Sequence, residues 1–406
     1  MSSLSERILA GAEGSYVDRE VDRAYVHDGT GVLTLEVWKA MGSPPLRYPE
    51  RVSIFFDHIA PANNSTTSTL QRELRIFATE RGLNFSDVGG GISHQLMAER
   101  GVLPGEIVVG ADSHTCTLGA FGAFATGMGA SDMAAIWAEG ATWFRVPETI
   151  QIFFEGALSD HAEAKDAALC YLSRLGMDGA IYRALEFRGE AVPDLGMDDR
   201  LTICNLAVET GAKAGMFYAD GITARYLKER GLEAELQEPE PCRCAGSVDI
   251  DLSAISPLVA VPPRVDRVRR VEELQGIPID QVFVGTCTNG RFSDMERLAR
   301  GLKGRKVMVR TIVVPASRAV LLASVKAGIV EELLRAGCTI APPGCGPCLG
   351  AHMGVLGEGE VCLSTANRNF TNRMGIGGEV YLASVSTAAA SAVKGEIAPP
   401  EVLDEA

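Results

Sequence analysis

Residues 281–291 read QVFVGTCTNGR, an apolar, β-branched run that ends in a glycine and opens into a polar loop around Cys287. The run predicts a short buried strand, and the glycine and small polar residues predict a turn at its carboxyl end. Ligands of open parallel sheets bind at that end of the strands. The stretch therefore predicts an α/β fold with functional groups in the loop that follows the strand.

Four more apolar runs are followed at once by polar or glycine-rich residues. They are VSIFF before Asp57, EIVVGA before Asp112, TIAPPG before Cys345 and VCLSTA before Asn367. Strands that alternate with helical segments indicate α/β layers. Because ligands lie at the carboxyl ends of parallel strands, we expect these loops to form one shared site.

One of the helical segments follows the EIVVGA run. Ser131 or Asp132 is expected to cap this helix at its N-terminus. Its apolar face is expected to carry Met133, Ile136, Trp137, Ala141 and Phe144.

The chain has 406 residues, which is longer than one hydrophobic core usually serves. Pro147 interrupts the apolar pattern, and so does the Pro262-Pro263 pair that follows a Pro/Glu-rich stretch. We therefore predict three domains, at residues 1–148, 149–265 and 266–406.

The composition, with a net charge of −14 and 22% charged residues, describes an acidic folded protein. We find no stripe of lysine and arginine interleaved with aromatics, and an acidic surface repels a phosphate backbone. The first residues lack the basic and apolar segments of a secretion signal, and no run approaches the roughly 18 apolar residues of a membrane span. We therefore expect a cytoplasmic protein that binds neither nucleic acid nor a membrane.

Ten cysteines in such a chain suit metal binding better than disulfides, because the cytosol keeps thiols reduced. The CGPC sequence that begins at Cys345 is also typical of a thioredoxin-type redox centre. The residues after it carry other polar motifs instead of the second half of a thioredoxin unit. A structural zinc site would need a second paired knuckle, which Cys338, His352 and Cys362 do not form. Both alternatives are disfavoured.

A third loop cysteine, Cys287, favours a metal–sulfur cluster with Cys345 and Cys348 as the other ligands. Iron–sulfur clusters are usually held by four cysteine thiolates. With three, one iron stays open to a substrate and can act as a Lewis acid on a hydroxyl or carboxylate. This arrangement indicates dehydratase chemistry.

Six motifs resemble the cluster and substrate motifs of the aconitase superfamily, in matching order and spacing. They are FDH at 56–58, GISHQ at 91–95, GADSHT at 110–115, GTCTNGR at 285–291, GCGPCLG at 344–350 and ANRNFTNR at 366–373. The resemblance extends over nearly the whole chain. It is strongest to the large subunits of 3-isopropylmalate dehydratase and homoaconitase, which lack the swivelling fourth domain of single-chain aconitases.

This resemblance implies an α/β fold of three aconitase-like α/β/α domains around a central iron–sulfur site, without the swivelling domain. It implies one [4Fe-4S] cluster per subunit, with one iron not ligated by cysteine, and a small partner subunit that carries the swivelling domain. The implied activity is that of a hydro-lyase that interconverts 2-isopropylmalate and 3-isopropylmalate by dehydration and rehydration in leucine biosynthesis.

Two alternatives to that activity stay open. Homoaconitase, or another 2-hydroxy-acid dehydratase, would use the same large-subunit motifs. An iron-sensing RNA-binding protein is an alternative of another class, since some aconitase relatives have that second role. The complete set of site residues and the missing basic stripe disfavour it.

The resemblance also implies roles for motif residues. The implied cluster ligands are Cys287, Cys345 and Cys348. The residues that would hydrogen-bond beside the cluster are Asn205 and Asn367. The residue pairs that would polarise the site around the open iron are His94 with Asp112 and His114 with Glu209.

His58 is the expected general acid for the departing hydroxyl. It follows Asp57 directly, and a neighbouring carboxylate raises the pKa of an imidazole and orients the ring. His27, at the end of another apolar run, has a weaker claim.

The expected substrate is a small 2-hydroxy di- or tricarboxylic acid. Arg368 and Arg373 suit it because a guanidinium binds a carboxylate in a planar fork, and Ser113 could donate to a carboxylate as well. The resemblance places the base, a serine, on the swivelling domain, and no residue of this chain is a good match for it. The HDGTGVL segment at 27–33 lacks the substrate-binding glutamine of single-chain aconitases, which disfavours citrate.

Overall fold

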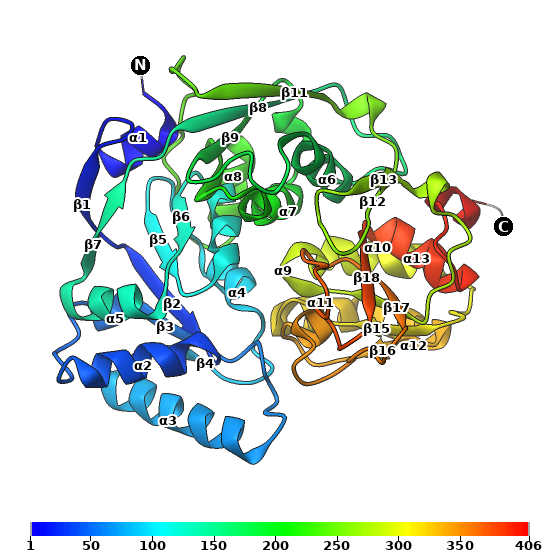
Figure 1. Cartoon of the computed structure of the whole chain (residues 1–406), viewed down its shortest axis with the longest axis horizontal. Helices are drawn as coiled ribbons and strands as arrows, with labels where there is room; N and C mark the ends of the chain where they lie inside the picture. The colour runs from blue at the N-terminus through cyan, green and yellow to red at the C-terminus, as the bar shows by residue number, and fades with distance from the viewer. Residues whose placement is uncertain (1, 405–406) are drawn as a thin grey trace.

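The computed structural model describes residues 2–404, which form three large sheets with flanking helices around a common centre (Figure 1). The first, middle and last parts of the chain each contribute one sheet, as the colour gradient shows. The predicted α/β layering is confirmed. No helix among residues 2–404 is long and apolar enough to cross a membrane.

The first sheet has five parallel strands, and two of the quoted apolar runs form its buried strands. Its order is β4 (Asn84–Ser86), β3 (Val52–Phe55), β2 (Arg23–His27), β5 (Ile107–Gly110) and β6 (Phe124–Gly127). Its helices are α1 (Leu4–Leu9), α2 (Thr30–Ala40), α3 (Ser65–Arg81), α4 (Ser93–Arg100) and α5 (Ala130–Glu139). A separate antiparallel pair joins β1 (Tyr16–Glu20) to β7 (Ala141–Arg145).

The second sheet is a smaller parallel one of four strands. Its order is β10 (Ala214–Phe217), β9 (Ala184–Arg188), β8 (Thr149–Glu155) and β11 (Gly246–Asp251). Its helices are α6 (Ala164–Leu175), α7 (Met197–Asn205) and α8 (Gly221–Lys228).

The third sheet has seven strands and is parallel except at one edge, where β12 runs antiparallel to both neighbours. Its order is β13 (Val268–Arg270), β12 (Leu258–Ala260), β18 (Glu379–Ala383), β17 (Val361–Ser364), β14 (Gln281–Val284), β15 (Arg310–Val313) and β16 (Thr339–Ile340). Its helices are α9 (Thr286–Asn289), α10 (Phe292–Leu302), α11 (Arg318–Lys326), α12 (Ile329–Ala336) and α13 (Val385–Lys394).

The sheets fall into the three predicted segments with one exception. Strand β12 lies before residue 265, in the segment predicted for the middle domain, but it pairs with the third sheet. The domain boundaries themselves stay a prediction.

The prediction for helix α5 was wrong at both ends. Gly129 is the N-cap and makes no side-chain hydrogen bond, whereas Ser131 and Asp132 lie within the helix. The helix ends at Gly140, whose φ of 71° lies in the left-handed region that glycine adopts without strain. Residues 141–145 are therefore not helical and form β7.

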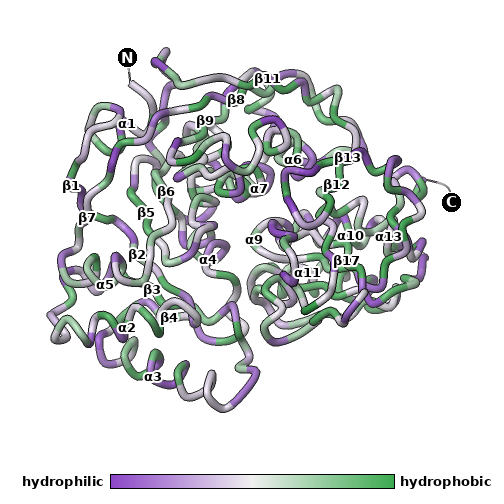
Figure 2. Tube along the Cα trace, in the orientation of Figure 1, coloured by the Kyte–Doolittle hydropathy of each residue, from purple (hydrophilic) through white to green (hydrophobic). Residues whose placement is uncertain are grey.

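Hydrophobic and hydrophilic residues alternate along most elements of the chain (Figure 2). One large cluster of buried apolar side chains includes residues of all three sheets, such as Phe55, Phe187 and Phe283. Because this core is shared, the strand ends of different sheets are held in fixed relation to one another.

Candidate active site

The loops after β3 and β16 meet although their strands belong to different sheets. The amide of Cys345 donates to the carbonyl of Asp57 at 2.7 Å. The sulfur of Cys345 lies 3.8 Å from Nδ1 of His58. The expected general acid and an expected cluster ligand are therefore neighbours.

Asp112 lies at the centre of a group of imidazoles. It caps the 3-10 helix η2 (Ser113–Phe121) by accepting from the amide of His114 at 2.8 Å. Its carboxylate oxygens lie 3.2–3.7 Å from four ring nitrogens, those of His27, His58, His94 and His114. Burial opposes a charge on Asp112, but the imidazoles, His94 first, hold its pKa well below the usual range. Asp112 therefore stays anionic and orients the rings around it.

Each ring nitrogen of His58 faces a carboxylate. Nδ1 lies 2.7 Å from Asp57, and Nε2 lies 3.2 Å from Asp112. Burial opposes the imidazolium, but the carboxylates of Asp57 and Asp112 outweigh burial and raise the pKa of His58 well above its usual value. His58 therefore carries a proton that it can deliver.

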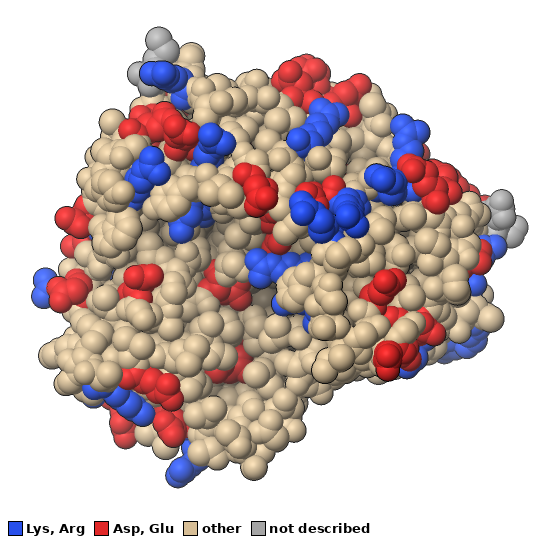
Figure 3. Space-filling model, in the orientation of Figure 1, with Lys and Arg blue, Asp and Glu red and all other residues tan. Residues whose placement is uncertain are grey.

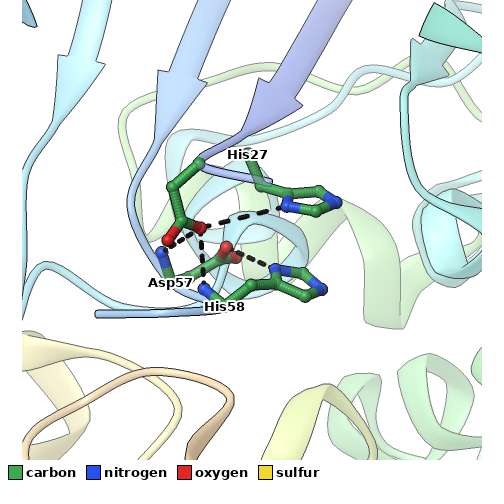
Figure 4. A group of neighbouring side chains, drawn as sticks. His27, Asp57 and His58 are labelled. Atoms are coloured by element: carbon green, nitrogen blue, oxygen red, sulfur yellow. Dashed lines mark hydrogen bonds and ion pairs between the residues drawn. The ribbon is translucent and has the colours of Figure 1, made fainter. Parts of the chain in front are cut away.

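His27 stacks on His58, with ring centroids 3.6 Å apart and planes at 18° (Figure 4). Its Nδ1 accepts from the amide of Gly29 at 3.2 Å, so a neutral ring keeps its proton on Nε2, toward Asp112. Burial and the charge of His58 lower the pKa of His27 to about 4. The pair thus consists of one neutral and one protonated ring.

His27, Asp28, Asp57 and His58 lie close enough together to resemble a metal site. Hydrogen bonds account for this spacing instead. Asp28 accepts from the amides of Asp57, His58 and Ile59 at 2.8–3.3 Å and from the Gln71 amide group at 3.1 Å. Asp57 accepts from the amide of Ser93 at 2.6 Å as well as facing His58. All four carboxylate oxygens of Asp28 and Asp57 already face donors. The two aspartates therefore hold the His58 loop in place.

The expected pair of His114 and Glu209 is in contact, with Nε2 2.9 Å from Oε1. Glu209 belongs to the 3-10 helix η4 (Leu206–Thr210) of the middle part of the chain. The same oxygen accepts from Nε of Arg368 at 2.8 Å, so this arginine is oriented by Glu209 and keeps its terminal nitrogens for other partners. Ser113, half-buried, lies next to this group.

The side-chain amide groups of two asparagines face the sulfur of Cys287. Nδ2 of Asn205 lies 3.1 Å from it and Nδ2 of Asn367 lies 3.5 Å from it. Asn367 also donates to Oδ1 of Asn205 at 3.0 Å. Both amide groups therefore lie beside one of the expected cluster ligands.

The Cys287 loop has a strained backbone. Thr286 has φ of 75°, a left-handed value that a β-branched residue rarely adopts. Gly285 precedes it with φ of 156°, and a Cβ there would lie 2.6 Å from the carbonyl of Val314. Strain of this kind persists where the surrounding structure fixes a functional loop.

Cys345 is the N-cap of the 3-10 helix η7 (Gly346–Leu349), and Cys348 lies within it. Nη2 of Arg373 donates to the Cys348 sulfur at 3.5 Å. The exposed fraction of each of the three cysteines is 8%, and none forms a disulfide. Burial raises the pKa of Cys287 to about 12 and that of Cys345 well above its usual value, so both hold their protons unless a cation replaces them.

The donor set fits an iron–sulfur cluster. All three thiols are buried, and amide and guanidinium groups point at the sulfurs of Cys287 and Cys348, as they do where thiolates carry charge. Oδ1 of Asn367 and Nε of Arg373 are buried without a protein partner. Such free polar atoms beside the thiols suit a bound group and its substrate.

Two cavities adjoin these loops. One of about 950 Å³ is lined by Lys165, Asn289, Arg291 and Asp294, on the Cys287 loop and its neighbours. A second of about 580 Å³ reaches Asp112 and Ser113. In Figure 3 the face of the molecule is hollowed near its centre, and acidic and basic side chains surround the hollow.

Sequence reasoning missed Asp28, Tyr25 and Thr115. The Tyr25 hydroxyl lies 2.7 Å from Nδ1 of His94 and donates to Thr115 at 2.9 Å, so it helps to orient His94. Asp28 directly follows His27 at the end of β2, which is the same signal that marked Asp57 after β3. No comparable signal marks Tyr25, whose side chain is fully buried within a strand.

A family model described as the Aconitase family (aconitate hydratase) matches residues 4–395 of the chain. The chain is 52% identical over 389 residues to the probable methanogen homoaconitase large subunit of Methanosarcina mazei, covering 95% of this chain and 99% of that protein. It is 48% identical over 396 residues to the 3-isopropylmalate dehydratase large subunit of Elusimicrobium minutum, covering 96% and 95%.

The fold is similar to the crystal structure of Thermococcus kodakaraensis aconitase X in its holo-form. The TM-score is 0.53, and the match covers 90% of this chain and 93% of that one. At 13% identity this likeness bears on the fold alone.

Proposed function

The chain belongs to the aconitase family, and from this premise we propose that it is the large subunit of a [4Fe-4S] hydro-lyase that interconverts 2-isopropylmalate and 3-isopropylmalate. The observation that carries the proposal is the contact between the thiol loops and the histidine network, at Cys345 and His58. It would put a cluster and a proton donor on the same substrate.

Cys287, Cys345 and Cys348 would hold the cluster, and Asn205 and Asn367 would donate hydrogen bonds beside it. When bound, the cluster supplies an iron without a cysteine ligand, a Lewis acid for the substrate's hydroxyl and carboxylate. Binding would release the thiol protons, which makes cluster loading depend on pH.

His58 would protonate the departing hydroxyl from Nε2. Asp57 fixes the ring through Nδ1, and stacking on the neutral His27 fixes its plane. Proton delivery of this kind contributes about 10²–10⁴-fold to the rate. His94 and His114, both directed by Asp112, would keep their rings ordered around the same substrate.

Arg368 and Arg373 would bind the substrate carboxylates. The terminal nitrogens of Arg368 remain for a carboxylate because Glu209 takes only its Nε. Ser113 would add a donor. Two guanidinium groups match the two carboxylates of isopropylmalate, which supports the dicarboxylic acid.

A small subunit with the swivelling domain would supply the base. Support comes from the names of the relatives, both of which are large subunits. With its base on another chain, this chain should turn over substrate only after mixing.

Homoaconitase activity is the second candidate, and the 52% identity to the Methanosarcina mazei protein favours testing it. The experiment is to mix the cluster-loaded chain with its small subunit and compare kcat/KM for 3-isopropylmalate and homoaconitate. The proposal expects the isopropylmalate value to be the larger. A larger homoaconitate value would transfer the assignment to the second candidate, and turnover of neither acid would overturn both.

A further inference from the structure

The first turn of α6 connects the middle of the chain to the third sheet through three buried charged residues, Glu163, Lys165 and Asp166. Glu163 accepts from the amides of Val385 and Ser386 at the start of α13, at 3.3 and 2.7 Å. Asp166 accepts from the amide of Leu258 in β12 at 2.8 Å. Each side chain therefore fixes a different stretch of main chain.

Lys165 reaches the end of β17. Its ammonium group donates to the carbonyl of Thr365 at 2.9 Å and to that of Ala366 at 2.5 Å. The residue is fully buried, and burial lowers its pKa to about 7. A buried ammonium is costly unless it is well hydrogen-bonded, so the two carbonyls must be held firmly where it needs them.

Those carbonyls immediately precede two residues of the candidate site. Asn367, the next residue, donates to Asn205 and to the Cys287 sulfur. Arg368 follows and contacts Glu209. A shift of the main chain at Ala366 would move both side chains together and displace the groups that bind the substrate.

We propose that Lys165 is a positioning residue of the active site, whose ammonium group fixes the carbonyls of Thr365 and Ala366 and thereby sets where Asn367 and Arg368 lie. Lys165 acts through the main chain. The kinetic test of its role rests on the function proposed above. Glu163 provides a matched comparison, because it belongs to the same turn but fixes α13.

The first measurement is hydrogen exchange of the reconstituted chain carrying Lys165→Met, with Glu163→Gln as the control. Losing a charged hydrogen bond should speed amide exchange in residues 366–373 at least about tenfold in Lys165→Met. In Glu163→Gln the faster exchange should appear at the start of α13 instead. Unchanged exchange of residues 366–373 in Lys165→Met would overturn the proposal.

The second measurement is steady-state kinetics of the complex with its small subunit. Displaced binding groups should raise KM about tenfold in Lys165→Met while kcat changes less, because ground-state binding is what is lost. Glu163→Gln should leave KM unchanged. Equal KM increases in both variants would mean a general loosening of the turn and would contradict a specific role of Lys165.

Lys165→Gln gives the same comparison if Lys165→Met does not fold. Its amide can donate to one carbonyl, so exchange and KM should fall between those of the wild type and of a variant with no donor. Wild-type values for Lys165→Gln would count against the proposal. A wild-type complex that turns over neither acid while the exchange pattern is as expected would refute the proposed hydro-lyase function. That result would leave the positioning role of Lys165 supported.

Discussion

Replacing Asp57 by asparagine tests how the acid is kept protonated. The Asp57 carboxylate is fully buried and serves two donors, the Ser93 amide at 2.6 Å and Nδ1 of His58 at 2.7 Å. Asparagine has one oxygen. Since the Ser93 amide is a fixed main-chain donor, that oxygen should face Ser93 and the new NH₂ group should face His58. Nδ1 must then accept, so the imidazole becomes neutral with its proton on Nε2.

Asp57→Asn should lower kcat by about 10²–10⁴-fold, because the variant loses most of the contribution of the general acid. Losing a hydrogen bond to a charged group should also lower the free energy of unfolding by about 1.5–3 kcal/mol. The assay is kcat of the cluster-loaded complex, with the visible spectrum confirming equal loading. Asp87→Asn is the control, because Asp87 bonds Arg75 on the exposed surface. A kcat for Asp57→Asn within a few fold of the control would refute this role of Asp57.

Cys287→Ser should abolish the visible absorption of the anaerobically prepared chain, whereas Cys170→Ser should keep it; a full spectrum in Cys287→Ser would remove this residue from the ligand set. Arg368→Lys keeps the charge but loses the planar fork, so KM should rise about tenfold or more with the spectrum intact, and an unchanged KM would argue against carboxylate binding there. The hydrogen bond from Arg75 lowers the pKa of Asp87, so that pair stabilises the fold above the usual pKa of Asp and loses its effect as pH falls through the lowered value. Asp87→Asn should therefore lower the free energy of unfolding at pH 7 by at most about 1 kcal/mol, and not in strong acid; an equal loss at both would contradict the ion-pair explanation.

The sequence predicted the strand-end loops well because their signal is local. An apolar run followed by glycine or a polar pair becomes a buried strand with a loop at its end, as at β14 before Cys287 and β3 before Asp57. Helix α5 was placed wrongly for a local reason too. Gly140 is a C-cap signal, but the apolar pattern runs past it into β7.

The contacts between sheets could not be read from the sequence. Lys165, in α6 beside the second sheet, reaches the carbonyl of Thr365 at the end of β17 across two hundred residues. Such placement depends on how the three sheets pack, which no spacing of motifs encodes. The pairs expected from family resemblance are in contact, whereas Lys165 belongs to no expected motif, and Asp28, which lies in the quoted segment 27–33, was given no role.

The most direct test of the central claim is a Mössbauer spectrum of the complex loaded with isotopically labelled iron, recorded with and without 2-isopropylmalate. Three cysteine ligands leave one of the four irons open to substrate. We expect the signal of that one iron to change when the acid is added, while the other three stay as they were. A spectrum of four cysteine-ligated irons that does not respond to substrate would contradict the account.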